Sequence, residues 1–187
     1  MARIPTVASK SDMPPEGQHV FDQVMGVFGR VRGPFSVLLH SPKLAERLLP
    51  MVPFAREGTI VEPQLRQIAV LAAVRERDAN YVWAAQVDAS RRVGLREAVI
   101  ELLRAKGDPS GLPEEERDII AYMRQLLRTN RVEQPVFDAL LRRHGVQWLV
   151  ELTAVANFYV ALSGVVNAFD VPVPEGGDRF VQSTATA

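Results

Sequence analysis

The chain has 187 residues, which is enough for one domain with a hydrophobic core and short for two. Its 22 Lys and Arg residues balance its 22 Asp and Glu residues, so no net charge attracts it to nucleic acid. Cysteine is absent, which excludes disulfides, thiolate metal ligands and thiol catalysis. The first 15 residues carry no apolar run of the kind found in signal peptides, and we expect a cytoplasmic protein.

Apolar residues recur at helical spacing along nearly the whole chain, and no alternating β pattern is present. The expected helices lie around residues 20–28, 42–58, 63–94 with a break at 78–80, 99–106, 113–127, 137–144 and 146–169. Ser41 and Pro42 favour a helix start, because serine is a good N-cap and proline fits the first turn. Acidic residues 114–116 suit the first turn of another helix, where the helix dipole favours negative charge.

The segment 146–169 is long and apolar enough to raise the question of a membrane span. It also contains Glu151, Asn157 and Asn167, and no basic residues follow directly after it. We therefore expect a buried helix, in the core or in a subunit interface, and no membrane association.

No internal repeat and no linker divides the chain. We predict one helical domain at residues 14–170 between two flexible segments, 1–13 and 171–187. The second of these segments is rich in small and polar residues, which bury too little apolar surface to pack firmly.

Three stretches in order, 33–44, 65–95 and 151–169, give a resemblance to a known family. They contain Gly-Pro-Phe-Ser-Val-Leu-Leu-His-Ser-Pro-Lys-Leu, then Leu-Arg-Gln-Ile-Ala-Val-Leu with Asn-Tyr-Val-Trp-Ala-Ala-Gln, and finally a long apolar helix ending in Asn-Ala-Phe. Together they resemble the carboxymuconolactone decarboxylase / alkyl hydroperoxidase D family over roughly residues 30–170. The resemblance implies an all-α, single-domain bundle of about six or seven helices, a site carried by a helix pair, and homo-oligomers, commonly trimers or hexamers.

The residues on which the family's chemistry depends are changed in this chain. The family's glutamate position is Gln67, its two cysteine positions are Ala79 and Val82, and its histidine position is Gln86. Peroxide reduction by a thiol pair is therefore disfavoured. Glutamine does not titrate, but it donates and accepts hydrogen bonds, so Gln67 and Gln86 could hold a carbonyl or carboxylate group of a substrate. In the alternative interpretation, Gln86 bonds to the backbone or to Gln67 and only shapes the core.

Four further residues near these positions are candidates. Tyr81 offers a hydroxyl that could bind an oxyanion or move a proton, and Trp83 and Val82 would contact the substrate, although aromatic residues at such positions often serve packing. His40 titrates near neutral pH and could act in catalysis, or it could brace the turn before Ser41. Histidine spacing gives no sign of a metal site.

The charged residues after Gln86 were also considered. Asp88, Arg91 and Arg92 are expected to point to the other side of that helix, away from the pair of glutamines.

The resemblance favours an enzyme of the decarboxylase or lyase type that works without an organic or metal cofactor. Its substrate would be a small oxygenated carboxylic acid, lactone or enol, and the reaction would be decarboxylation, isomerisation or lactone chemistry. The alternative is a non-catalytic protein of the same fold that binds a small ligand or acts as a structural oligomer.

Overall fold

The computed structural model describes residues 2–180, and this part of the chain forms helices joined by loops, without a strand. Seven of its α-helices have eight residues or more, in agreement with the six or seven expected. Their bounds, with those of the shorter ones, are α1 (Gln18–Phe28), α2 (Pro34–Leu38), α3 (Pro42–Leu48), α4 (Met51–Pro53), α5 (Pro63–Glu76), α6 (Asn80–Arg92), α7 (Glu97–Arg104), α8 (Glu114–Thr129), α9 (Gln134–His144) and α10 (Val146–Ala168). A π-helical turn, η3 (Phe54–Gly58), continues α4, and 3-10 turns occupy Lys10–Asp12, Pro15–Gly17 and Pro109–Gly111.

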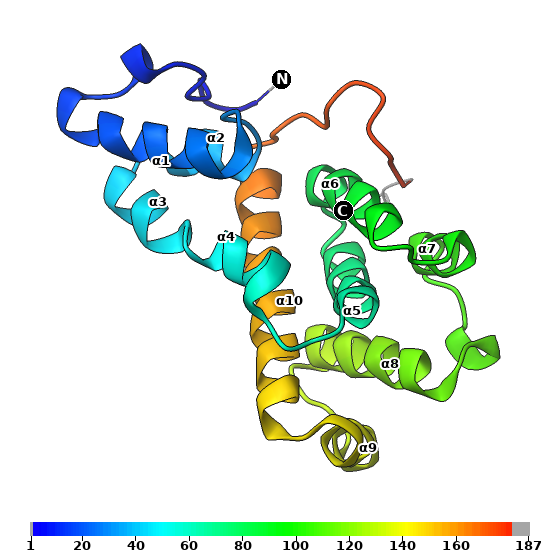
Figure 1. Cartoon of the computed structure of the whole chain (residues 1–187). Helices are drawn as coiled ribbons and strands as arrows, with labels where there is room; N and C mark the ends of the chain where they lie inside the picture. The colour runs from blue at the N-terminus through cyan, green and yellow to red at the C-terminus, as the bar shows by residue number, and fades with distance from the viewer. Residues whose placement is uncertain (1, 181–187) are drawn as a thin grey trace.

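The helix α5 lies at the centre of the bundle, between α6, α7, α8 and α10 (Figure 1). Residues 66–75 within it are all buried. A helix that is buried on every side carries no polar face toward water, which explains its unbroken run of Ile, Val, Leu and Ala. Each such large aliphatic side chain contributes about 1.5–3 kcal/mol by leaving water.

The turn between α5 and α6 brings these two helices side by side. Asp78 adopts a left-handed conformation with φ of 48°, and its N–H donates to the Arg75 carbonyl at 3.2 Å. The next N–H, of Ala79, donates to the Val74 carbonyl at 3.4 Å. Such bonds satisfy the last carbonyls of a helix while the chain reverses. The break predicted at residues 78–80 is confirmed, and it positions the helix pair on which the candidate site lies.

The long helix α10 packs along α5 and also contacts α2, α6 and α9. It is the one helix in residues 2–180 that is long and apolar enough to cross a membrane by length and composition, and half of its most apolar window is buried inside the protein. This burial agrees with the core helix expected. Its first turns leave Val146 and Val150 exposed to water.

Both terminal segments differ from the flexible ones expected, because they contact the bundle. Val7 is fully buried and its N–H donates to the Ser36 carbonyl at 2.9 Å. At the other end, residues 171–180 run from α10 across to α6 and α7 (Figure 1), and Asn80 exchanges hydrogen bonds with the backbone of Phe180 at 3.0 and 3.3 Å. The rest of the predicted tail, residues 181–187, lies outside the described residues.

Candidate functional site

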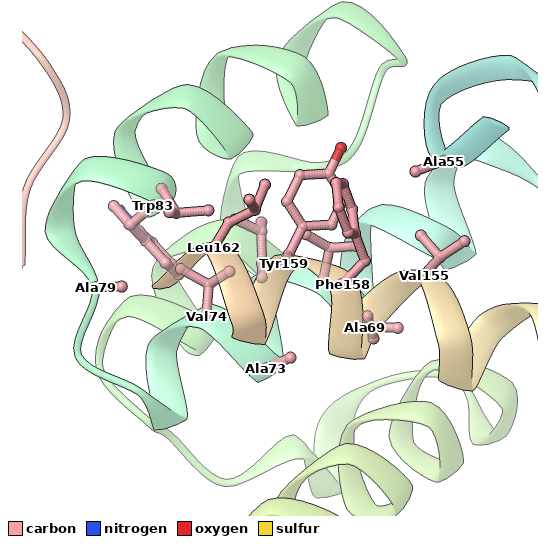
Figure 2. Close-up of a cluster of buried hydrophobic side chains, with 14 of the residues drawn as sticks. Ala55, Ala69, Ala73, Val74, Ala79, Trp83, Val155, Phe158, Tyr159 and Leu162 are labelled. Carbon is pink, nitrogen blue, oxygen red and sulfur yellow. The ribbon is translucent and has the colours of Figure 1, made fainter. Parts of the chain in front are cut away.

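A cavity of about 270 Å³ lies between the loop that follows α1, the turn η3, and the helices α5, α6 and α10. Its floor comes from α10, where Phe158, Tyr159 and Leu162 lie side by side and the Tyr159 hydroxyl points away from the helix (Figure 2). The other lining residues are Val27, Phe28, Arg30, Arg32, Pro34, Phe35, Val52, Arg56, Gln67, Tyr81, Val82, Ala85, Gln86, Asp88, Ala89 and Arg92.

Four of the six site residues predicted from the sequence line this one cavity. Gln67 comes from α5, and Tyr81, Val82 and Gln86 come from the facing side of α6. The two glutamines therefore share a cavity, as the proposed pocket requires.

The other two predicted residues lie elsewhere. Trp83 is fully buried on a different side of α6, with its ring edge-on to that of Phe180 at 5.5 Å between centroids. His40 is exposed, and its Nε2 lies 2.8 Å from the carbonyl oxygen of Pro5. This contact matches the bracing interpretation of His40, and neither residue lines the cavity.

Ser90 links the two glutamines inside the protein. Its fully buried Oγ lies 2.7 Å from the carbonyl oxygen of Gln86 and 3.3 Å from Oε1 of Gln67. Because a serine hydroxyl has one proton to donate, the shorter contact takes the larger share of it. The contact fixes Gln67 in the cavity wall.

Gln86 has an unusual hydrogen-bonding position. Only 9% of the residue is exposed, and its Oε1 has no hydrogen-bond partner among the described residues. Its side chain approaches the hydroxyl of Tyr159. A buried acceptor without a donor costs about 1–3 kcal/mol. The interpretation in which Gln86 is a satisfied core residue is therefore not what the structure shows, and its free acceptor lies in the wall of a cavity.

The two cavity tyrosines are protonated phenols at neutral pH. Burial raises the pKa of Tyr81, and the positive charges of Arg32 and Arg30 oppose that rise. Burial likewise raises the pKa of Tyr159, against the influence of Arg56 and Arg66. Both hydroxyls can therefore donate a hydrogen bond, and neither is a base at neutral pH. Sequence reasoning did not select Tyr159, which resembles a packing residue of an apolar helix.

Four arginines, Arg30, Arg32, Arg56 and Arg92, surround the cavity against a single carboxylate, that of Asp88. The expectation that Asp88 and Arg92 point away from the glutamines is wrong. Counted from Tyr81, positions at spacings of four, seven, eight and eleven fall on one helical face, which turns Asp88 and Arg92 toward the cavity mouth. Only Arg91 points elsewhere, where it pairs with Glu97 at 2.6 Å.

Behind the floor, Arg66 lies 95% buried, and its Nε has no partner among the described residues, while Nη1 donates to the Val61 carbonyl at 3.4 Å. Burial lowers the pKa of its guanidinium, although nearby Tyr159 and Glu57 oppose this. With the four arginines at the mouth, it makes the region around Tyr159 electropositive.

The arrangement supports hydrogen bonding and anion binding rather than thiol chemistry. Ala79, at the first cysteine position implied by the resemblance, is fully buried at the start of α6, and Val82 occupies the second. Among residues 2–180, no cluster of three or more histidine, aspartate and glutamate side chains is placed to hold a metal ion.

The helical arrangement is that of the alkyl hydroperoxidase D-like (AhpD-like) fold, as solved structures show. One is an uncharacterised peroxidase-related protein from Ralstonia eutropha JMP134 with an alkylhydroperoxidase AhpD core, 17% identical, with a TM-score of 0.75 over 94% of this chain and 93% of that one. Another peroxidase-related protein, from Silicibacter sp. TM1040, is 16% identical, with a TM-score of 0.72 over 92% and 94%.

A third similar structure is a cysteine-to-alanine variant of the debrominase Bmp8 in complex with 2,3,4-tribromopyrrole. It is 15% identical, with a TM-score of 0.71 over 93% of this chain and 94% of that one. No family model matches the sequence, and no curated protein matches it. At these identities the likeness shows a shared AhpD-like fold, in agreement with the fold expected from the sequence.

Proposed function

We propose that this chain is an enzyme that acts, without an organic or metal cofactor, on a small oxygenated carboxylic acid, lactone or enol. The reaction is a decarboxylation, an isomerisation or a lactone conversion, of the carboxymuconolactone decarboxylase type. One observation carries the proposal: Gln67, Gln86 and Tyr81 line a single cavity whose mouth holds four arginines. A mostly apolar cavity with a few placed polar groups is typical of small-molecule sites.

The residues of the cavity suggest how such a reaction would be helped. The arginines would attract the anionic substrate, and Gln67 would orient its oxygens. These reactions pass through enolate-like states, in which negative charge develops on oxygen. The phenols of Tyr81 and Tyr159, which stay protonated at neutral pH, would donate hydrogen bonds to that oxygen. Tyr81 would also supply the proton that the substrate carbon takes up. His40 has no part in this proposal because it lies outside the cavity.

A second candidate function, a non-catalytic ligand-binding protein, has an observation in its favour. Among the described residues, no histidine and no cysteine lines the cavity, so general acid–base work falls on tyrosine or on Asp88. Binding needs no titrating group. Turnover, rather than binding, therefore separates the two functions.

The first experiment is a thermal-shift screen of wild type against small aromatic acids, enol acids and lactones, with Gln86→Leu as the control variant. A ligand at a hundredfold excess over its Kd stabilises the folded protein by about 2.7 kcal/mol. We expect a shift in wild type that is lost or reduced in Gln86→Leu. Equal shifts in both proteins, or none in either, would contradict a ligand site at Gln86.

Each compound that binds is then incubated with wild type and with Tyr81→Phe, and the products are followed by NMR. We expect loss of carbon dioxide, double-bond migration or lactone opening with wild type, at a rate that falls at least about tenfold in Tyr81→Phe. Binding without any conversion would favour the non-catalytic alternative.

A further inference from the structure

The cavity presents two different chemical demands at two places. Its mouth offers positive charge, and its wall offers a buried acceptor that has no donor. A ligand that satisfies both must be an anion and must also carry a hydrogen-bond donor. The inference below rests on the proposed function, in which this cavity is the substrate site.

The four arginines at the mouth are uncommitted. In residues 2–180, none of Arg30, Arg32, Arg56 and Arg92 lies in an ion pair or in a hydrogen bond to another side chain. Arginines elsewhere in the protein are paired: Arg128 with Glu76 at 2.6 Å, and Arg143 with Glu114 at 3.0 Å. The local excess of unpaired guanidinium groups over Asp88 therefore favours an anionic ligand.

The wall of the cavity points to the second group. Gln86 is 91% buried, and its Oε1 has no partner among the described residues. A carbonyl oxygen accepts only from an N–H or O–H group, so the anion alone cannot satisfy it. A ligand hydroxyl would satisfy it and could at the same time accept a bond from the Tyr159 hydroxyl, which the Gln86 side chain approaches.

The size and the floor of the cavity limit the rest of the ligand. About 270 Å³ is small for a ligand pocket, and the floor is formed by Phe158 and Leu162 with Val82 on the opposite wall. A flat, apolar body such as one ring or a short unsaturated chain fits these surfaces.

We infer that this cavity binds a small hydroxy acid or enol acid, with its carboxylate at the arginines of the mouth and its hydroxyl donating to Oε1 of Gln86. Within the proposed substrate classes, the inference selects acids that carry a free hydroxyl or enol hydrogen and disfavours lactones that have neither. It requires no conversion of the ligand, so it stands apart from whether the protein is an enzyme.

The test is calorimetric titration with matched probes: the three hydroxybenzoate isomers, benzoate, which lacks the hydroxyl, and phenol, which lacks the carboxylate. We expect at least one hydroxybenzoate to bind wild type about tenfold or more tightly than benzoate, the usual scale for leaving a buried polar group unpaired. Phenol should bind more weakly still, and added salt should weaken the acids but not phenol.

Two variants locate the groups. Gln86→Met keeps the side-chain length and removes the acceptor, so it should abolish the preference for hydroxybenzoate while leaving benzoate binding intact, which also shows that the variant is folded. Arg92→Gln should weaken hydroxybenzoate and benzoate alike. Arg142→Gln is the matched control, because Arg142 is exposed on α9 and does not line the cavity.

The inference is overturned if benzoate binds wild type as tightly as every hydroxybenzoate, if phenol equals them, if Gln86→Met keeps the preference, or if no probe binds. Its failure is distinguishable from that of the proposed function. Hydroxy-acid binding with the expected variant pattern but no conversion of any acid would support the inference and contradict the enzyme.

Discussion

At the scale of single residues, Tyr159 shows how one side chain serves both packing and the site. Its ring lies in the apolar floor, and only 7% of the residue is exposed (Figure 2). Its hydroxyl faces Gln86 and the electropositive region of Arg56 and Arg66. The helical pattern of α10 predicts that position 159 is buried, but not that its hydroxyl reaches a cavity. Burial follows from local periodicity, whereas the neighbours of an oxygen atom depend on segments far away in the sequence.

Tyr159 leads to a prediction about alkaline pH. Its pKa is raised in the folded protein, so the folded state holds the phenolic proton more tightly than the unfolded state does. The corresponding stability is fully present below the unfolded pKa of about 10 and is lost as pH rises through the folded pKa. The free energy of unfolding should therefore fall above about pH 10, by up to about 1.4 kcal/mol per pH unit for each such tyrosine.

Tyr81, whose pKa burial also raises, should contribute to the same fall. We expect the decline to be less steep in Tyr159→Phe than in wild type, as measured by urea unfolding at a series of pH values. Tyr122→Phe is the comparison, because Tyr122 lies in a different part of the bundle, where its hydroxyl is 2.8 Å from Oγ1 of Thr153. Identical slopes in wild type and Tyr159→Phe would show that ionisation of Tyr159 does not limit stability.

At the scale of elements, the loop between α1 and α2 holds one wall of the cavity against α6. Gly33 adopts φ of 64°, a conformation that side chains disfavour, and a Cβ there would collide with the ring of Tyr81. The same loop carries Arg30 and Arg32 to the mouth. Close approach of backbone to ring is thus what fixes Tyr81 in the cavity wall.

Gly33→Ala should therefore disturb both stability and ligand binding. We expect about 1–2 kcal/mol from the backbone conformation and about 1–3 kcal/mol from overpacking against Tyr81, as measured by denaturant unfolding. Gly29→Ala is a matched control, because Gly29 has a similar φ of 68° and open space around it. It should show the backbone cost alone and bind hydroxybenzoate like wild type. Equal losses in the two variants would refute the contact with Tyr81.

Comparison of elements shows what the sequence could and could not predict. The helix starts at Pro42 and Pro63 and the break before α6 follow from local chemistry, so they were predictable. The pairing of Gln67 with Gln86 came from the family resemblance. The ring of arginines was missed, because Arg32, Arg56 and Arg92 come from three separate elements and only the folded chain brings them together.

At the scale of the whole molecule, an apolar groove on the side away from the cavity bears on assembly. It lies between α8, α9 and the start of α10, and no charged residue lines it in the described part of the chain. Phe137 is 36% exposed, Val146 67% and Val150 60%. Contiguous exposed apolar surface of this kind marks interaction sites in soluble proteins. The resemblance implies homo-oligomers, and we propose that a second copy of the chain covers this groove.

The proposal predicts that Val150→Glu lowers the oligomeric state, because a charge in a desolvated interface costs several kcal/mol unless it is paired. Light scattering coupled to size-exclusion chromatography should give a trimer or hexamer for wild type and a smaller species for the variant. Leu44→Glu is the control: Leu44 is 48% exposed on α3, outside the groove, so this variant should keep the wild-type mass. Val150 is already exposed, so the protomer should still fold, which circular dichroism would verify. A monomeric wild type, or a Val150→Glu protein of unchanged mass, would show that the groove is not the subunit interface.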